Sequence, residues 1–117
     1  MLTFVCYPKC STCKKAEGFL KEENIDYILR NIKTDNPTID ELRLWYQKSQ
    51  LPLKRFFNTS GLIYRSMGLK DKLDTMSEEE QLSLLATDGM LVKRPILVGD
   101  DFVLVGFKES QWKEKLS

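Results

Sequence analysis

The stretch of sequence that decides the fold is Leu2–Asn31, which reads LTFVCYPKCSTCKKAEGFLKEENIDYILRN. Its first residues, 2–6, are apolar and β-prone, which predicts a short buried strand. After a turn at 7–9, apolar side chains recur at the spacing of one helix face as far as about Glu23. Residues 26–31 then predict a second strand. A strand, a helix and a second strand in this order are typical of a parallel pair joined by a crossover helix.

The middle of the chain, from about residue 36 to residue 90, predicts an insertion made of helices and no strand. Two capping-box signatures each predict the start of an amphipathic helix, and they are Thr38 with Glu41 and Ser77 with Glu80. Shorter helical pieces are predicted between these helices, at 54–58 and 61–69.

The last part of the chain predicts a hairpin and a closing helix. Ile96–Val98 and 102–105 are short β-prone runs separated by Gly99-Asp100-Asp101, a turn signal. Residues 109–116 predict a helix. The whole chain, 1–117, is therefore predicted to be a single α/β domain in the order βαβ, helical insertion, ββα.

Composition and charge narrow the function classes. The chain of 117 residues is 42% apolar and 30% charged, and its net charge is +1. Such a balance gives no general field toward nucleic acid or anionic lipid, so direct nucleic-acid binding is not expected. No apolar run has the roughly 18–20 residues that a membrane span needs, and the N-terminus does not resemble a signal peptide. We expect a cytoplasmic monomer with no membrane association, whose thiols are kept reduced.

The absence of histidine removes much chemistry, because this side chain is the commonest general base near neutral pH. Ser-His-Asp and Cys-His catalysis are excluded. Three cysteines remain, at positions 6, 10 and 13. An odd number of cysteines in a cytosolic chain indicates a metal site or a redox pair in place of a disulfide framework.

The strongest chemical motif is Cys10–Cys13, CSTC, at the predicted junction of strand and helix. Unpaired N–H groups and the helix dipole favour an anion there, so the thiolate of Cys10 is favoured over the thiol. Lys9 and Lys14 add positive charge. Cys13, one turn further on, lies on the buried face and can attack a sulfur bonded to Cys10.

Two other interpretations of these cysteines stay open. Both members of the motif could be small buried apolar residues, as free cysteines often are. A zinc site is the other alternative, but zinc prefers four nitrogen or sulfur ligands, and Cys6 cannot complete such a set without histidine. Cys6 itself alternates with Phe4 on a strand, which favours core packing over a redox role.

Four stretches of the chain together resemble one family: Tyr7-Pro8-Lys9-Cys10-Ser11-Thr12-Cys13-Lys14-Lys15-Ala16, Asn58-Thr59-Ser60-Gly61, Lys93-Arg94-Pro95-Ile96 and Val105-Gly106-Phe107. It is the family that contains the glutaredoxin-coupled arsenate reductases (ArsC) and the Spx transcription regulators. The resemblance covers essentially the whole chain.

The resemblance implies a thioredoxin-like fold, with a mixed four-stranded sheet and helices on both faces. It implies a catalytic thiolate at Cys10, a cis peptide bond before Pro95 and an anion-binding cation at Arg94. Without the resemblance, an X-Pro bond is expected to be trans, and Arg94 could be a solvated arginine. No metal or bound organic cofactor is implied, because glutathione, glutaredoxin or thioredoxin would supply the electrons.

Several positions depart from the arsenate reductases. Asn58 and Phe107 stand where those enzymes have two of three arginines around the thiolate, so Arg94 alone is retained. Arg55 is either a replacement cation or a residue that faces solvent. Cys13 is a second thiol that those enzymes generally lack, and it could resolve an intermediate internally. Arsenate is therefore expected to be a poor substrate.

These observations predict a thiol–disulfide oxidoreductase that reacts through Cys10, Cys13 and Arg94. The alternative is a redox-sensing regulator of the Spx kind, which binds RNA polymerase. Spx regulators share the CxxC motif, but they have a glycine where this chain has Leu51-Pro52.

Overall fold

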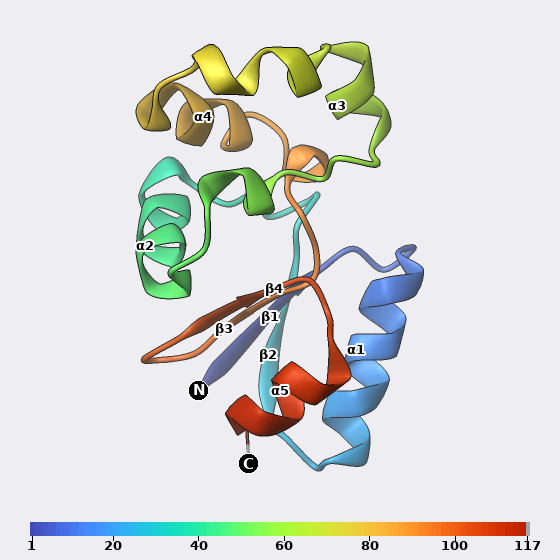
Figure 1. The fold of residues 1–117 in the computed structure, drawn as a ribbon. Coiled ribbons are helices and arrows are strands. Elements are labelled where there is room, and N and C mark those ends of the chain that lie inside the picture. The colour runs from blue at the N-terminus through green and yellow to red at the C-terminus, as the bar shows by residue number, and fades with distance from the viewer. Residues whose placement is uncertain (117) are drawn as a thin grey trace.

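The fold is a four-stranded sheet between helices, shown in Figure 1 by a computed structural model that describes residues 1–116. The strand order is β2-β1-β3-β4, with β1 parallel to β2 and antiparallel to β3, and β3 antiparallel to β4. The strands are β1 (Leu2–Cys6), β2 (Tyr27–Asn31), β3 (Ile96–Val98) and β4 (Val103–Val105). The predicted mixed sheet is confirmed.

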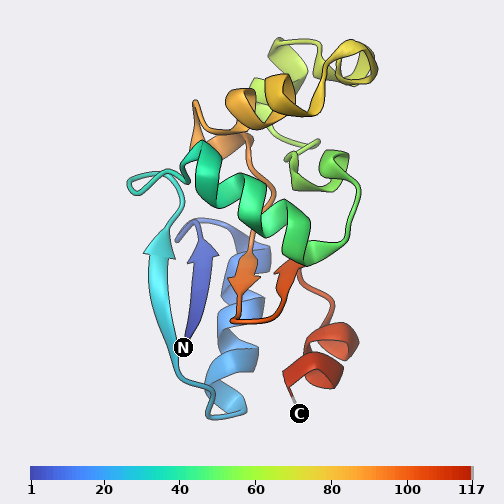
Figure 2. The same cartoon turned by 90° about the vertical axis from the view of Figure 1, so that its left-hand side faces the viewer.

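Two helices cover one face of the sheet, and the insertion covers the other. On β1, Phe4 and Cys6 pack against α1 (Ser11–Glu22) and α5 (Glu109–Leu116), whereas Val5 packs toward α2 (Ile39–Ser49). This alternation follows from the two-residue period of a strand. Figure 2 shows α2 on the side of the sheet away from α1. Helices on both faces are therefore confirmed.

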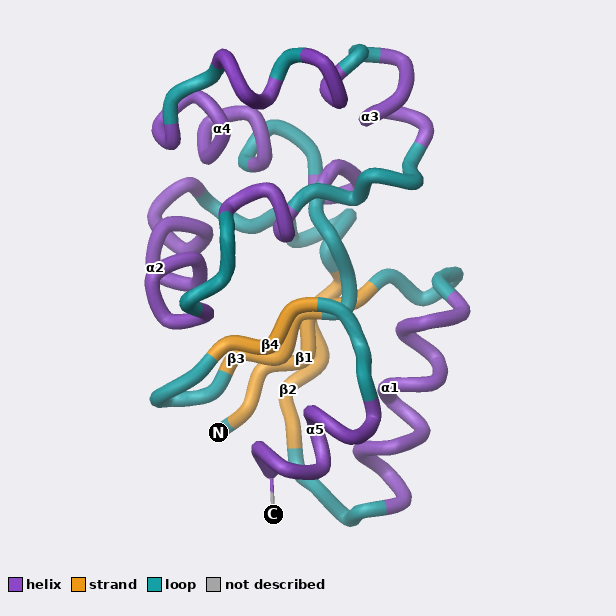
Figure 3. Tube along the Cα trace, in the orientation of Figure 1, coloured by secondary structure: helices purple, strands orange, loops and turns teal. Residues whose placement is uncertain are grey.

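The insertion is built from helices and short 3-10 turns, as Figure 3 shows. Its α-helices are α2, α3 (Leu62–Ser66) and α4 (Glu78–Leu85). Both predicted capping boxes are present, at Thr38 with Glu41 and at Ser77 with Glu80. Among residues 1–116, the structure contains no helix with the length and apolarity that crossing a bilayer requires.

The predicted helical pieces at 54–58 and 61–69 are wrong in extent. The first is a 3-10 turn at Leu53–Phe56, after which Phe57 forms an antiparallel bridge with Val92. The second ends at Ser66, because Gly68 adopts a left-handed conformation with φ +63°. A glycine in this conformation commonly ends a helix. Both boundaries depend on tertiary pairing or on one backbone angle, which apolar periodicity does not report.

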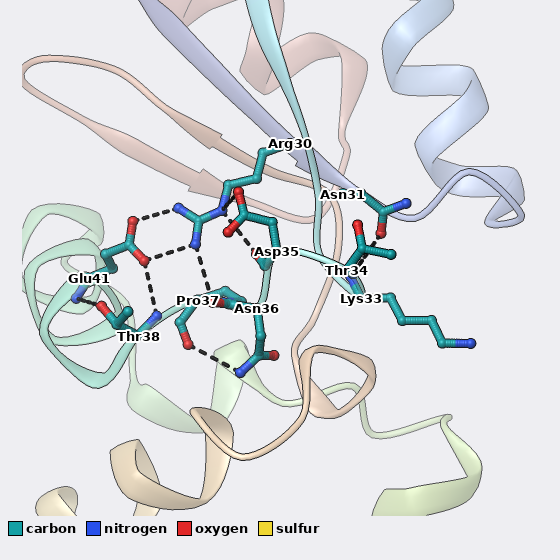
Figure 4. A network of polar contacts seen from close by, with 9 residues as sticks. All are labelled: Arg30, Asn31, Lys33, Thr34, Asp35, Asn36, Pro37, Thr38 and Glu41. Carbon is teal, nitrogen blue, oxygen red and sulfur yellow. Dashed lines mark hydrogen bonds and ion pairs between the residues drawn. The ribbon is translucent and has the colours of Figure 1, made fainter.

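An ion pair ties the insertion to the sheet at the end of β2 (Figure 4). The Arg30 guanidinium binds both carboxylate oxygens of Glu41, with Nη2 2.9 Å from Oε1. The bond from Arg30 lowers the pKa of Glu41 to about 2, and it outweighs the opposing effect of burial. Because the same carboxylate accepts the Thr38 N–H, the pair also holds the start of α2.

We expect Glu41→Gln to destabilise the fold by about 1 kcal/mol at neutral pH, a modest value because Glu41 is partly exposed. A carboxyl group whose pKa is lowered by folding stabilises the fold above its unfolded pKa. The contribution is lost as pH falls from about 4.5 toward 2. Urea unfolding of both proteins across this range checks the expectation. In an Arg30→Gln background, Glu41→Gln should no longer change how the free energy of unfolding depends on pH. If Glu41→Gln still removes the same pH-dependent stability there, the expectation is contradicted.

Candidate functional site

A tight turn carries the chain from β1 into the first cysteine of the motif. The Cys10 N–H donates to the Tyr7 carbonyl at 3.0 Å, and Pro8 occupies the second turn position, where its fixed φ fits. Cys10 is the N-cap of α1, and its carbonyl accepts the first helical bond from the Lys14 N–H at 3.1 Å. The predicted junction of strand and helix is confirmed.

Positive charge and unpaired N–H groups surround Cys10. The first turn of α1 contains no acidic residue, and its first residues, Ser11 and Thr12, contribute backbone N–H groups that have no partner within the helix. Lys9 and Lys14 are exposed on either side. Cys10 itself is half-buried. This setting suits an anion that is accessible from solvent.

Cys13 lies one turn deeper and is almost completely buried, with 2% of its surface exposed. Its sulfur accepts the Tyr7 N–H at 3.4 Å, and its side chain packs in one cluster with Cys6 and Cys10. The neighbouring Cys6 thiol is the largest influence that raises the pKa of Cys13, and burial is the second. The Tyr7 N–H opposes this shift. Cys13 is therefore held as a thiol.

Cys6 is buried in the same core cluster as Cys13, so its predicted core position is confirmed. Its contact with the Cys13 sulfur was not predicted. The hydrogen bond with Cys13 lowers the pKa of Cys6, against the effect of burial. The sequence contains a signal for this proximity, because strand alternation places Cys6 on the face of the sheet that the buried side of α1 covers. The three thiols form one connected group.

Arg94 lies beside the turn that precedes Cys10. Its guanidinium carbon is 5.4 Å from the centre of the Tyr7 ring, and its Nη1 donates to the Met90 carbonyl at 3.3 Å. Its Nε is buried and has no hydrogen-bond partner among residues 1–116. The peptide bond between Arg94 and the buried Pro95 is cis, as the resemblance implied.

Asn58 reaches the same carbonyl as Arg94. Its Nδ2 is 3.5 Å from the Met90 oxygen, and its backbone N–H donates to the Leu91 carbonyl at 2.8 Å. Gly61 makes room for this side chain, because a Cβ there would lie 2.7 Å from Nδ2. The structure thus brings Asn58 and Arg94 together, although more than 30 residues separate them.

Arg55 and Phe107 do not join this group. Arg55 is exposed on the 3-10 turn Leu53–Phe56 and has no side-chain partner in the described part of the chain. Phe107 packs against Phe19 and Trp112, with ring centres 5.9 and 5.0 Å apart. An apolar side chain that packs against the core therefore stands at this position.

Two residues of the site, Tyr7 and Lys33, were not predicted from the sequence. Tyr7 contacts a second cation, with Lys33 Nζ 6.0 Å from its ring centre. The Asn31 side chain accepts the N–H groups of Lys33 and Thr34 and so shapes the turn after β2, drawn in Figure 4. Because β1 and β2 are parallel, their carboxyl ends meet at one edge of the sheet. Tyr7 follows β1 and Lys33 follows β2, so the predicted parallel pair could have placed these two residues close together.

The described residues hold no group of three or more histidine, cysteine or acidic side chains arranged to bind a metal ion. The reactive and charged groups of the site are therefore the three thiols, the Arg94 guanidinium and the neighbouring lysines.

Known proteins resemble this chain over most of its length. The model of the ArsC family matches residues 6–115. An ArsC family related protein from Bacteroides fragilis is 56% identical, with a TM-score of 0.97 over 99% of this chain and 97% of that one. A protein described as a possible arsenate reductase, from Streptococcus mutans UA159, is 46% identical, with a TM-score of 0.88 over 97% and 98%. The global transcriptional regulator Spx of Staphylococcus epidermidis is 27% identical over 95% of this chain and 83% of its own length.

Proposed function

Since the chain belongs to the ArsC family, we propose that it is a thiol–disulfide oxidoreductase in which Cys10 is the nucleophile and Cys13 the resolving thiol. The observation that carries the proposal is the packed pair of cysteines at the start of α1, with Cys10 at the N-cap and Cys13 one turn deeper. Cys10 is half-exposed and Cys13 is buried. An oxidised substrate can therefore reach Cys10 first, whereas Cys13 meets only a sulfur already bonded to Cys10.

The reaction runs in two exchange steps. The Cys10 thiolate attacks one sulfur of a substrate disulfide, and the other substrate sulfur leaves as a thiolate. Cys13 then loses its proton and attacks the Cys10 sulfur, which releases the second substrate sulfur and leaves a Cys10–Cys13 disulfide. Glutathione, glutaredoxin or thioredoxin reduces this disulfide and completes the cycle, so no bound cofactor takes part.

Arg94 gives the site a preference for anionic substrates. Its buried Nε lacks a partner among residues 1–116, and a buried donor without a partner is costly unless a ligand satisfies it. Lys33 and Lys9 add positive charge around the same turn. A carboxylate-bearing thiol such as glutathione fits these donors, because charge-assisted hydrogen bonds to carboxylates are strong.

We expect turnover of a glutathione mixed disulfide and only weak reduction of arsenate. A site with three arginines binds a tetrahedral oxyanion through charge-assisted bonds worth roughly 1.5–3 kcal/mol each. Asn58 and Phe107 supply no charge, so arsenate loses a factor of about ten or more for each missing arginine.

The test compares both substrates in one assay that couples turnover to a glutaredoxin system. Robust arsenate turnover that Arg55→Ala abolishes would show that Arg55 replaces a missing arginine. No turnover of any disulfide would contradict the proposed enzyme.

The second candidate function is a redox-sensing regulator, and the 27% identity to Spx favours it. In that case the Cys10–Cys13 disulfide alters a surface that binds RNA polymerase, without turnover. Pro52 argues against the same contact, since it lacks the backbone N–H and the freedom of the glycine in regulators. Its φ is −59°, at the start of the 3-10 turn Leu53–Phe56. Catalytic turnover separates the two functions.

A further inference from the structure

The proposed reaction uses two of three cysteines that lie in one packed cluster. Cys13 is the shared neighbour, because it packs in one cluster with Cys6 in the core and with the half-buried Cys10 toward solvent. The backbone gives independent evidence for this placement. The Tyr7 amide nitrogen, which is covalently joined to Cys6, lies 3.4 Å from the Cys13 sulfur.

We propose that Cys6 is a third redox thiol of this site, which displaces Cys10 from Cys13 and moves the disulfide into the core. The proposal rests on the proposed function, because it starts from the Cys10–Cys13 disulfide. Cys6 is only 5% exposed and shares its buried cluster with Cys13, so Cys13 can react with it where an external disulfide cannot reach it directly.

The step is a thiol–disulfide exchange that needs no further oxidant. Cys6 gives up its proton and attacks the Cys13 sulfur, so a Cys6–Cys13 bond forms while the Cys10–Cys13 bond breaks. The electron pair of the broken bond leaves with Cys10, which takes up the proton. For this bond to form, the two sulfurs must approach to about 2.05 Å, the length of a disulfide. The reverse step needs only attack by the Cys10 thiolate.

The exchange has a consequence for the chemistry of the site. Once the disulfide lies between Cys6 and Cys13, Cys10 is again a free thiol at the protein surface. The oxidised pair is buried, and access limits the rate at which an external thiol reduces a disulfide. The protein can then hold one disulfide, a two-electron oxidation, in its core while Cys10 reacts again.

The Cys10→Ser variant tests the proposal, because it leaves Cys6 and Cys13 alone and replaces a half-exposed side chain. The full chain is incubated with glutathione disulfide and reduced glutathione at several ratios until the thiol content is constant, so that transient opening lets the buried thiols reach equilibrium. It is then quenched with acid and alkylated. Trypsin cleaves after Lys9, so Cys6 and Cys13 fall in separate peptides, 1–9 and 10–14.

We expect Cys10→Ser to lose both thiols together and to give peptide 1–9 linked to peptide 10–14. The matched control is the double variant Cys6→Ala and Cys10→Ser, which cannot form this link. Thiols that stay free in Cys10→Ser, or that carry only glutathione, would overturn the proposal. Links found only between two protein molecules would overturn it as well.

A second arm separates this proposal from the proposed function. In Cys6→Ala, the disulfide should form within peptide 10–14, and reduced glutathione should reduce it at least tenfold faster than the final oxidised form of the unmodified protein. If this disulfide does not form, the proposed function is contradicted, while the result for Cys10→Ser still decides the role of Cys6. Equal rates of reduction would overturn the transfer into the core.

Discussion

Replacing Cys10 with serine is expected to lower kcat/KM for a glutathione mixed disulfide by at least about 1,000-fold, because a serine hydroxyl is a poor nucleophile without a neighbouring base. Cys10 is the half-exposed thiol of the site, and it lies at the start of α1 between Lys9 and Lys14. The buried Cys13 cannot take its place at the rate of turnover, since it is 2% exposed and its pKa is raised by the interaction with Cys6 and by burial.

The matched variant is Cys13→Ser, which keeps the nucleophile and removes the resolving thiol. We expect it to complete the first exchange with substrate and then to stall as a mixed disulfide. A coupled assay with purified proteins measures both effects. Turnover by Cys10→Ser within tenfold of the unmodified protein would contradict the assignment of the nucleophile.

Replacing Trp112 with alanine is expected to destabilise the fold by about 3–5 kcal/mol, the range for deleting a large buried aromatic side chain. Trp112 is fully buried, and its ring packs edge-on against Phe4, Phe19 and Phe107. Its Nε1–H donates to the Gly106 carbonyl at 3.1 Å, and the Gly106 N–H donates to the Pro95 carbonyl at 2.8 Å.

Urea unfolding measures this loss, with two controls. Trp112→Phe keeps a ring but loses the bond to Gly106, so a smaller loss of about 1–2 kcal/mol is expected. Leu62→Ala changes a side chain that is 82% exposed and should stay within about 0.5 kcal/mol of the unmodified protein. A loss below 1 kcal/mol for Trp112→Ala would show that α5 contributes little to the core.

The parts of the fold that the sequence predicts are those with local signals. Thr38 with Glu41 and Ser77 with Glu80 form their capping boxes within four residues, so the two helix starts were predictable. The βαβ unit follows from apolar periodicity. Asn58 was placed on a helix wrongly, because the bridge between Phe57 and Val92 joins segments that local periodicity cannot relate.

The candidate site was predictable to a similar degree. The CxxC motif and its helix N-terminus are local, and Arg94 came from a resemblance that spans the chain. The contact of Cys6 with Cys13 and the shared Met90 carbonyl of Asn58 and Arg94 depend on how β1, α1 and the insertion pack. Neither follows from spacing alone.

The central claim is that Cys10 reacts first and Cys13 resolves, and peptide mapping after brief exposure to glutathione disulfide tests it most directly. In the unmodified protein, the first stable product should be a disulfide within peptide 10–14 with little bound glutathione. In Cys13→Ser, glutathione should accumulate on Cys10. Glutathione on Cys6 in that variant, or equal accumulation of the mixed disulfide in both proteins, would contradict the account.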